Sequence, residues 1–415
     1  MSARSTVGWG ALAAVALSAL ACKNTGASPE LPTWHKRPNY SLGVVNRRVL
    51  TAENAVLGED YERGRPELDP KKNRVFVGTA DRALYALRAE DLSTIWRFQT
   101  LSYVQSEPLY DAEENVVYFG SNDGALYKVT ADHGDLLFRF STNAEISRKP
   151  LISGGLLYVT NANDTIVALN PANGELKWTQ HRTPAYGMEI AGYAGVSAHG
   201  GKVYTSFSDG RVFAFDAADG RERWSADLSA EAESQGPDIP KYLDADATPL
   251  VVQTGQGTLV MAASYAGGVY ALDAATGARV WASEKAKGVV ELTLWDEPEH
   301  ASSDGGPPIP RRRMLLAASG TTGLWALDLE DGRELWRRSL PEGGVSAPVA
   351  AAGAILLSTT RYGLFLISPI DGKVIDGIDT GTGFAQTPAA YGRRAFAMTN
   401  AGALLGIHID APRAR

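Results

Sequence analysis

The chain has 415 residues, of which 44% are hydrophobic and 21% charged, and its 40 basic and 47 acidic residues give a formal net charge of −7. A net negative charge argues against nucleic acid as a partner. The length alone would suggest two or three domains, but the repeats described below run on without a break in character and favour one domain.

The N-terminus has the pattern of an export signal. Arg4 is followed by an uncharged apolar stretch, Val7–Leu20, and then by the small-residue boundary Ala21-Cys22. The stretch is too short to span a membrane. We therefore expect residues 1–21 to be removed, which takes away Arg4 and leaves 39 basic and 47 acidic residues, a net charge of −8.

The single cysteine of the chain stands directly after this segment. In Ala19-Leu20-Ala21-Cys22, a loose match to the lipobox of bacterial lipoproteins, Cys22 occupies the position that is acylated and becomes the mature N-terminus. We expect a lipoprotein signal peptide at 1–21, a lipidated tether at 22–38 and, because Lys23 replaces the Asp that retains lipoproteins at the inner membrane, an outer-membrane location. The alternative is an ordinary signal peptide whose cysteine is incidental.

Beyond the tether, one unit recurs along the chain. It is a strand-like run, a turn, a second apolar strand, an Asp/Gly turn and then a tryptophan or its equivalent, repeating at roughly 40–45 residues with no helical pattern. The second-strand-and-turn units lie at 83–92, 125–134, 165–174, 211–220, 268–277, 323–332 and 363–372, with a shortened copy at 403–409. The sequence predicts an all-β fold, an eight-bladed β-propeller of four-stranded antiparallel blades.

Residues 105–142 are the clearest unit. The innermost strand contains Pro108, which an edge strand tolerates because it need not donate every backbone hydrogen bond. Asn122-Asp123-Gly124 provides a tight hairpin. The inner-strand proline recurs at Pro66, Pro150, Pro249, Pro348 and Pro388.

A large aromatic residue follows the turn by about four residues in six of the seven full units. We expect these residues to be structural, because their apolar area can join neighbouring blades, and not to form a cofactor cage. They are Trp96, Phe138, Trp178, Trp224, Trp281 and Trp336.

The eighth unit ends before it can form an outer strand, which leaves an open sheet edge. Residues 40–50, YSLGVVNRRVL, have strand character and no hairpin of their own. We predict that this N-terminal strand completes the last blade and closes the ring, so that the propeller domain covers residues 39–410.

At this level of detail the chain resembles a known family. Its Asp/Gly turns followed by Trp224 and Trp281 look like the repeat of quinoprotein propellers. The lipobox, the eight units and the incomplete last blade resemble the BamB family, a lipoprotein of the machinery that assembles outer-membrane β-barrels. The stretches 242–252 and 383–388 are similar to Asp-x-Asp-x-Thr-Pro and Gly-Phe-Gln-Thr-x-Pro of that family, and the resemblance covers roughly residues 34–409.

The resemblance implies a partner and a site. Asp244 and Asp246, with Met188 and Ile190 at the positions of a family Leu-x-Leu-Arg-Gly segment, would contact the barrel-assembly subunit (BamA-like). It also implies contact with nascent outer-membrane proteins and a lipid-anchored location facing the periplasm. Two carboxylates spaced two residues apart on an extended segment point the same way and could receive one basic side chain. The alternative is that both are solvated loop carboxylates.

Two features depart from the family. Ala191 stands where the family has an arginine, so a cationic contact is lost. Segments 228–243 and 295–314 are expected insertions, and the second carries the run Arg311-Arg312-Arg313, which could bind an acidic surface or anionic lipid, or form a solvated loop.

Quinoprotein dehydrogenases share the repeat and place a quinone and Ca²⁺ on the propeller axis, so an enzyme must be considered. With Cys22 as its sole cysteine, the chain cannot form the vicinal disulfide that many of them use. Its six histidines match no metal-ligand spacing. We expect a non-enzymatic scaffold with no cofactor and no metal. The alternatives are a paralogous exported propeller that binds another envelope protein or ligand and, less well supported, a quinoprotein dehydrogenase.

Overall fold

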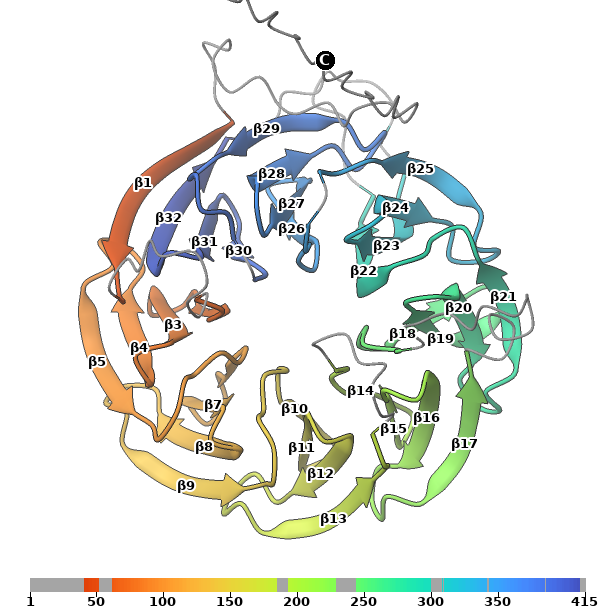
Figure 1. Ribbon diagram of the computed structural model, residues 1–415, viewed down its shortest axis with the longest axis horizontal. Helices are drawn as coiled ribbons and strands as arrows, with labels where there is room; N and C mark the ends of the chain where they lie inside the picture. Colours follow the sequence, from red (N-terminus) through yellow and green to blue (C-terminus); the bar gives the residue numbers. More distant parts are fainter. Residues whose placement is uncertain are drawn as a thin grey trace, which may run out of the picture.

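The computed structural model describes residues 41–51, 62–184, 193–228, 244–299, 308, 310–341, 343–384 and 386–410. These residues form eight four-stranded antiparallel sheets, arranged as blades in a ring around a central axis (Figure 1). The prediction of an all-β, eight-bladed propeller is confirmed. Over the same ranges, no helix is long and apolar enough to cross a membrane.

In the first seven blades the strands run in chain order from the axis outward, whereas in the eighth blade the outermost strand comes from the N-terminal part of the chain (Figure 1). Blade 1 contains β2 (Pro66–Asp69), β3 (Arg74–Thr79), β4 (Ala83–Arg88) and β5 (Thr94–Gln99), and blade 2 contains β6 (Leu109–Asp111), β7 (Val116–Gly120), β8 (Ala125–Thr130) and β9 (Leu136–Ser141). Blade 3 contains β10 (Leu151–Ser153), β11 (Leu156–Asn161), β12 (Thr165–Leu169) and β13 (Leu176–His181), and blade 4 contains β14 (Ser197–His199), β15 (Lys202–Ser206), β16 (Arg211–Asp216) and β17 (Glu222–Asp227).

Blade 5 contains β18 (Leu250–Thr254), β19 (Gly257–Ser264), β20 (Gly268–Asp273) and β21 (Arg279–Ser283), and blade 6 contains β22 (Val289–Glu297), β23 (Arg312–Ser319), β24 (Gly323–Leu327) and β25 (Glu334–Arg338). Blade 7 contains β26 (Val349–Ala351), β27 (Ala354–Thr359), β28 (Gly363–Ile367) and β29 (Val374–Ile378). Blade 8 contains β30 (Ala389–Tyr391), β31 (Arg394–Met398), β32 (Ala403–Ile409) and, outermost, β1 (Leu42–Val49).

The ring closes as the sequence predicts. β1 pairs antiparallel with β32, with Leu42 opposite Ile409 and Val49 opposite Ala403. In Figure 1, β1 lies outside β32 as the outermost strand of blade 8, so the two ends of the described chain are side by side in one sheet. Pairing with β1 removes the open edge that β32 would otherwise present.

The burial pattern follows the position of each strand. The second and third strands are covered on both faces by adjacent blades, so β7 is buried throughout and β8 at all but its last residue. Outer strands alternate instead, and in β13 only Trp178 is buried. The core is accordingly a series of clusters between blades, one of which joins Phe76 of blade 1 to Val117 of blade 2.

A repeated contact joins neighbouring blades, and we call it the docking contact. The tryptophan of one outer strand packs on the glycine of the next blade's Asp/Gly turn: a Cβ at Gly220, where φ is +71°, would lie 2.5 Å from the Trp178 ring. The indole Nε1 also donates a hydrogen bond of 2.9 to 3.2 Å to a carbonyl of the same turn. The pairs are Trp96 with Ala131, Trp178 with Ala217, Trp224 with Ala274, Trp281 with Leu329 and Trp336 with Pro369. The structural role predicted for these residues is confirmed.

Blade 2 carries Phe138 at this position, and the rest of the blade supplies what phenylalanine lacks. Phe138 packs on Gly174, but it has no N–H to donate. The matching carbonyl, Pro171 O, instead accepts hydrogen bonds from Tyr118 Oη at 3.1 Å and Lys128 Nζ at 2.8 Å. The carbonyl is therefore satisfied without the indole.

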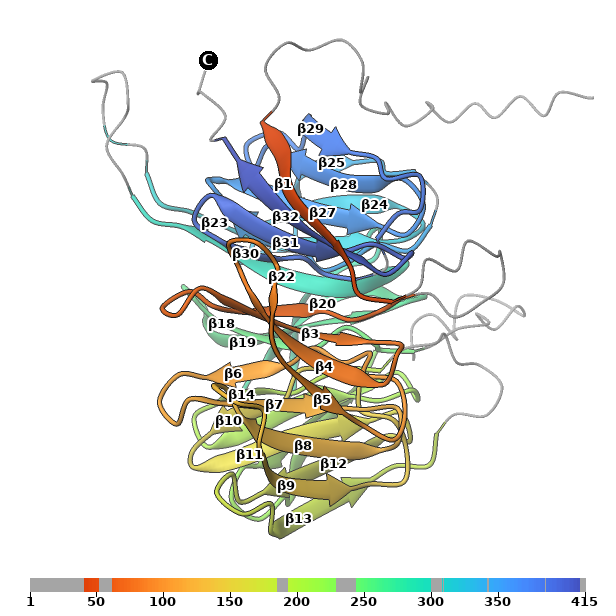
Figure 2. The same ribbon diagram turned by 90° about the vertical axis from the view of Figure 1, so that its left-hand side faces the viewer.

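The expected insertion at 295–314 is partly strand. β22 and β23 continue into it, with Trp295 opposite Met314 and Glu297 opposite Arg312, and the pair extends beyond one face of the ring (Figure 2). Asp296 binds Arg311 at 2.5 Å and lies 3.4 Å from Arg313. The carboxylate thus offsets part of the positive charge of the arginine run. Residues 229–243 of the other expected insertion lie outside the described residues.

Candidate functional site: the propeller axis

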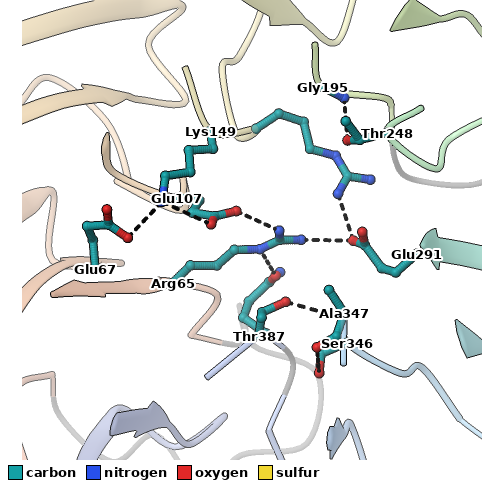
Figure 3. Close-up of polar contacts among 12 residues, drawn as sticks. Arg65, Glu67, Glu107, Lys149, Gly195, Thr248, Glu291, Ser346, Ala347 and Thr387 are labelled. Carbon is teal, nitrogen blue, oxygen red and sulfur yellow. Dashed lines mark hydrogen bonds and ion pairs between the residues drawn. The ribbon is translucent and has the colours of Figure 1, made fainter. Parts of the chain in front are cut away.

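The strand register aligns one position of every inner strand at the axis. This axial residue directly precedes the inner-strand proline. In blades 4 and 6, which lack the proline, it directly precedes Val196 and Leu292. We call the eight residues the axial ring, and Figure 3 shows them gathered around the centre. They are Arg65, Glu107, Lys149, Gly195, Thr248, Glu291, Ala347 and Thr387.

Arg65 connects three blades besides its own. Its Nη1 lies 3.0 Å from Glu107 of blade 2, and its Nη2 lies 3.2 Å from Glu291 of blade 6. Its Nε donates to Gln386 of blade 8 at 2.5 Å. A guanidinium is suited to this role because its planar fork can serve several acceptors at once.

Arg148 of blade 3 reaches the same carboxylate, with Nη1 2.7 Å from Glu291 Oε1. Arg65 and Arg148 come from blades 1 and 3, on either side of blade 2, whereas Glu291 comes from blade 6 across the ring (Figure 1). The two ion pairs of Glu291 therefore cross the axis. Burial alone would raise the pKa of Glu291, but Arg148 and Arg65 outweigh it and hold that pKa below its usual range. Arg65, Glu291 and Arg148 therefore form an ion-paired bridge across the channel, which we call the axial bridge.

Shorter contacts complete the axial ring. Lys149 Nζ lies 2.8 Å from Glu67 and 3.7 Å from Glu107. Thr248 and Thr387 occupy equivalent positions in blades 5 and 8, and each hydroxyl accepts a backbone N–H from the preceding blade, Gly195 at 2.8 Å and Ala347 at 3.2 Å. These threonines belong to the two sequence stretches that resemble the BamB family.

A cavity of about 610 Å³ lies beside the axial bridge. In an antiparallel blade, the turns between second and third strands share one face with the connections between blades. We call this the loop face, and the cavity is on that side because Ala162 and Thr321 of such turns, and Glu145 and Gly343 of such connections, contribute to its lining. The cavity thus faces the connection that contains Asp246.

Asp244 and Asp246, predicted to bind a partner, lead into β18 in blade 5 and are buried, with 1% and 8% of their surfaces exposed. Asp246 lines the cavity. Burial, with the negative charge of Asp244, raises the pKa of Asp246 to about 7. The alternative of two freely solvated carboxylates does not describe them, whereas their contact with a partner stays a prediction.

The other predicted site residues, Cys22, Met188 and Ile190, lie outside the described residues. The residues that the sequence prediction missed are those of the axial ring and Arg148. A signal for most of them was available, because an axial residue directly precedes the proline that recurs in the inner strands. Glu291 lacks even that signal, since Leu292 replaces the proline in blade 6.

The axis is equipped for binding by charge and hydrogen bonds. Within the described ranges, no group of three or more His, Cys, Asp or Glu side chains is arranged to hold a metal ion. Burial raises the pKa of Tyr193, another cavity residue, to about 12, so its hydroxyl stays protonated and donates to the Glu145 carbonyl at 3.0 Å.

Comparison with known proteins gives matches to most of the propeller. The family model described as outer membrane protein assembly factor BamB matches residues 105–297 and 269–412. The assembly factor BamB of Yersinia pestis is 25% identical over 235 residues, which are 50% of this chain and 57% of that protein, and that of Bordetella pertussis is 22% identical over 240 residues, 57% and 56%. The chain thus spans a little over half the length of these relatives.

Solved structures show the same fold. BamB from Moraxella catarrhalis superposes with a TM-score of 0.67 at 19% identity, covering 89% of this chain and all of that one. A quinohemoprotein alcohol dehydrogenase from Pseudomonas putida HK5 gives 0.62 at 14% identity, covering 90% and 77%. At these identities the likeness concerns the fold alone. The family match extends over most of the propeller, and this chain therefore belongs to the BamB outer membrane protein assembly factor family.

Proposed function

We propose that this protein is a non-enzymatic scaffold that assists the assembly and insertion of β-barrel proteins into the outer membrane by binding the barrel-assembly subunit. The observation that carries the proposal is the family match over residues 105–412, which includes the blades that contribute Asp244 and Asp246. A rigid ring with many connections on one face suits contact with more than one partner. Its outer strands also offer edges to which an extended substrate could add.

The axis supports binding over catalysis. Quinoprotein dehydrogenases use the propeller axis for their cofactor, whereas here the axial bridge joins Arg65, Glu291 and Arg148 across it. Removing the Glu291 carboxylate would leave the buried Arg148 guanidinium without its ion-pair partner. The axis of this chain is thus committed to holding blades 1, 3 and 6 in register.

The proposed location follows from the N-terminal pattern. Acylation of Cys22 would anchor the protein in the outer membrane, with the propeller in the periplasm. The tether of residues 22–38 would separate the ring from the lipid surface. Mass spectrometry of the mature protein tests this directly: an N-terminal diacylated or triacylated Cys22 is expected, and an unmodified terminus elsewhere would contradict it.

The proposed contact lies on the loop face. Asp244 and Asp246 enter it from blade 5, and Met188 and Ile190 belong to the connection between β13 and β14. A desolvated charge pair at an interface can carry much of the binding energy. With Ala191 in place of the family arginine, the acidic pair would supply the main charged contact from this side.

A double variant tests the contact. Asp244→Ala with Asp246→Ala is expected to lose binding to the purified periplasmic region of the barrel-assembly subunit, measured by surface plasmon resonance. The matched control is Glu113→Gln, an exposed carboxylate on the turn between β6 and β7. Circular dichroism confirms that the double variant is folded. Unchanged binding by a folded double variant would refute the assigned contact.

A further inference from the structure

The axial cavity contains a carboxylate that forms no hydrogen bond or ion pair with any side chain in the described ranges. Asp246 lines the cavity with 8% of its surface exposed, and its carboxylate accepts no hydrogen bond from any residue in the described ranges. Its backbone carbonyl, in contrast, accepts one from Arg148 Nη2 at 3.0 Å. A buried carboxylate without a partner is costly, so the site lacks a donor.

The charges around Asp246 show which donor is missing. Asp244, Asp164 and Glu291 all act on Asp246 with negative charge, and Arg148 is the cation that opposes them. Each of the three guanidinium nitrogens of Arg148 already donates a hydrogen bond elsewhere, to Glu291, to the Tyr193 carbonyl and to the Asp246 carbonyl. Although Arg63 and Arg65 also line the cavity, the charges that act most strongly on Asp246 are therefore mainly negative, and the missing donor is a cation.

The walls of the cavity restrict the shape of that cation. Its lining includes the aliphatic side chains of Val290 and Val345 and the aromatic side chains of Tyr193 and Tyr265. Such walls favour an alkyl stem and can contact a cationic head through a ring face. A volume of about 610 Å³ accommodates a whole side chain or a small amine.

We propose that the axial cavity binds an ammonium or guanidinium group carried on an aliphatic stem, with the Asp246 carboxylate as its anchor. The group can come from a lysine or arginine side chain of a protein or from a free aliphatic amine. Only the first source rests on the proposed function, because there Asp246 would serve the same partner.

Binding of the cation is linked to protons. Burial disfavours the negative charge of Asp246, and the nearby Asp244, Asp164 and Glu291 add to the effect, so that the pKa of Asp246 lies at about 7. A cation binds the ionised form. Affinity should therefore fall about tenfold between pH 8 and pH 6, and binding at pH 7 should release about half a proton per bound cation.

Isothermal titration calorimetry on the full-length, detergent-solubilised protein tests the proposal with defined probes. The probes are agmatine, a tripeptide with a central arginine and blocked ends, and the same tripeptide with citrulline, which keeps the shape and removes the charge. Agmatine, the arginine peptide or both should bind, and the citrulline peptide should bind at least tenfold more weakly. Equal binding of the charged and neutral peptides, or no binding of either cation, would overturn the proposal.

Two variants locate the site. Asp246→Asn should weaken cation binding at least tenfold, whereas Glu113→Gln should bind as the wild type does. If Asp246→Asn fails to fold, the wild-type pH series decides: an affinity that does not change between pH 8 and pH 6 would contradict anchoring by Asp246.

The probes also separate the two sources and the two proposals. Tighter binding of the arginine peptide than of agmatine indicates a protein side chain, and the reverse order indicates a free amine. If the barrel-assembly subunit binds while neither cationic probe does, the cavity proposal fails and the assembly role stands. If the probes bind and the subunit does not, the assembly role fails instead.

Discussion

Two kinds of blade interface hold this ring together, and they differ in chemistry. Between most blades an indole or a phenyl ring packs on a turn glycine of the next blade, as Trp178 does on Gly220. Blades 7 and 8, where the chain ends meet, have no aromatic ring at this position. The register places Asp376 in blade 7 and Asn46 in blade 8 where the other outer strands carry the ring. We call this region, β1 with its contacts to blades 7 and 1, the closure seam.

In the closure seam, polar contacts take the place of the aromatic ring, beside the apolar clusters that contain Leu42 and Leu50. Leu42 N donates to Asp376 Oδ2 at 2.9 Å, and Asn46 Nδ2 donates to the Glu90 carbonyl at 2.5 Å. Arg48 donates to the Leu92 carbonyl of blade 1 at 2.5 Å. These bonds are directional, so they define where β1 lies along β32.

The difference follows from how the strands are connected. Outer strands such as β13 follow their neighbour through a short turn, which already determines the register, so their docking contacts are not needed to align the strand. β1 comes from the opposite end of the sequence and has no turn to align it. A slip by one residue would exchange its faces, and hydrogen bonds from Leu42 and Asn46 oppose that slip.

The largest expected effect is on a docking contact. Trp224→Ala removes a side chain that is 8% exposed, together with its hydrogen bond to Ala274 O, and should cost about 3–5 kcal/mol of unfolding free energy. Differential scanning calorimetry measures it. Trp224→Phe, which retains most of the apolar area, should lose less. A thermal midpoint equal to that of the wild type in Trp224→Ala would contradict the structural role.

The next effect distinguishes the closure seam by its response to pH. Glu62 follows β1 and is 3% exposed; it accepts hydrogen bonds from Ala80 N at 2.9 and 3.1 Å, and its own N–H bonds to Asn400 O. Burial, opposed by these bonds, raises the pKa of Glu62 from 4.5 to about 7.

Between these two pKa values the folded protein keeps a proton that the unfolded chain releases. Stability is therefore lost as the pH rises through this window, by at most about 3 kcal/mol. Urea unfolding at pH 5 and pH 8 should show a smaller loss in Glu62→Gln than in the wild type. An identical loss in both would show that Glu62 does not titrate as described.

A smaller effect is expected where blade 7 meets β1. Asp376→Ala removes the acceptor for Leu42 N and should cost about 1–2 kcal/mol, whereas Asp376→Asn keeps an acceptor oxygen and should cost less. Hydrogen exchange of the β1 amides should rise in Asp376→Ala and stay unchanged in the strands of blade 4. Faster exchange in blade 4 to the same extent would mean that the seam is not a separate region.

The smallest effect concerns blade 2, where phenylalanine replaces tryptophan. Tyr118→Phe removes one of the two donors to Pro171 O, and Lys128 Nζ remains, so about 0.5–1.5 kcal/mol should be lost. Tyr204→Phe removes the equivalent hydrogen bond to Ala274 O, which also accepts one from the Trp224 indole, and should lose no more stability than Tyr118→Phe. A larger loss at Tyr204 than at Tyr118 would contradict the compensation argued for Phe138.

Much of this fold could be predicted because it repeats. Each strand pattern, turn and aromatic position recurs, so a unit such as 105–142 predicts the others, and the missing outer strand of the eighth unit pointed to residues 40–50. The polar groups of the closure seam carry no repeat signal. Asp376 and Asn46 become meaningful only when the register shows that they replace an aromatic residue.

The site was harder to predict because its contacts cross the axis. Glu291 meets Arg65 and Arg148 from positions far apart in the sequence, and no local spacing indicates that pairing. Asp246 was identified through resemblance to a family motif, but its burial depends on the blades around it. Cys22, Met188 and Ile190 remain predictions from the sequence.

The most direct test of the assembly role is to purify the full-length, lipidated protein from solubilised native envelopes and identify its partners by mass spectrometry. We expect the barrel-assembly subunit to be recovered in near-equal amount. Its absence, with another envelope protein recovered in its place, would contradict the proposed role and indicate a propeller of the same family that serves a different partner.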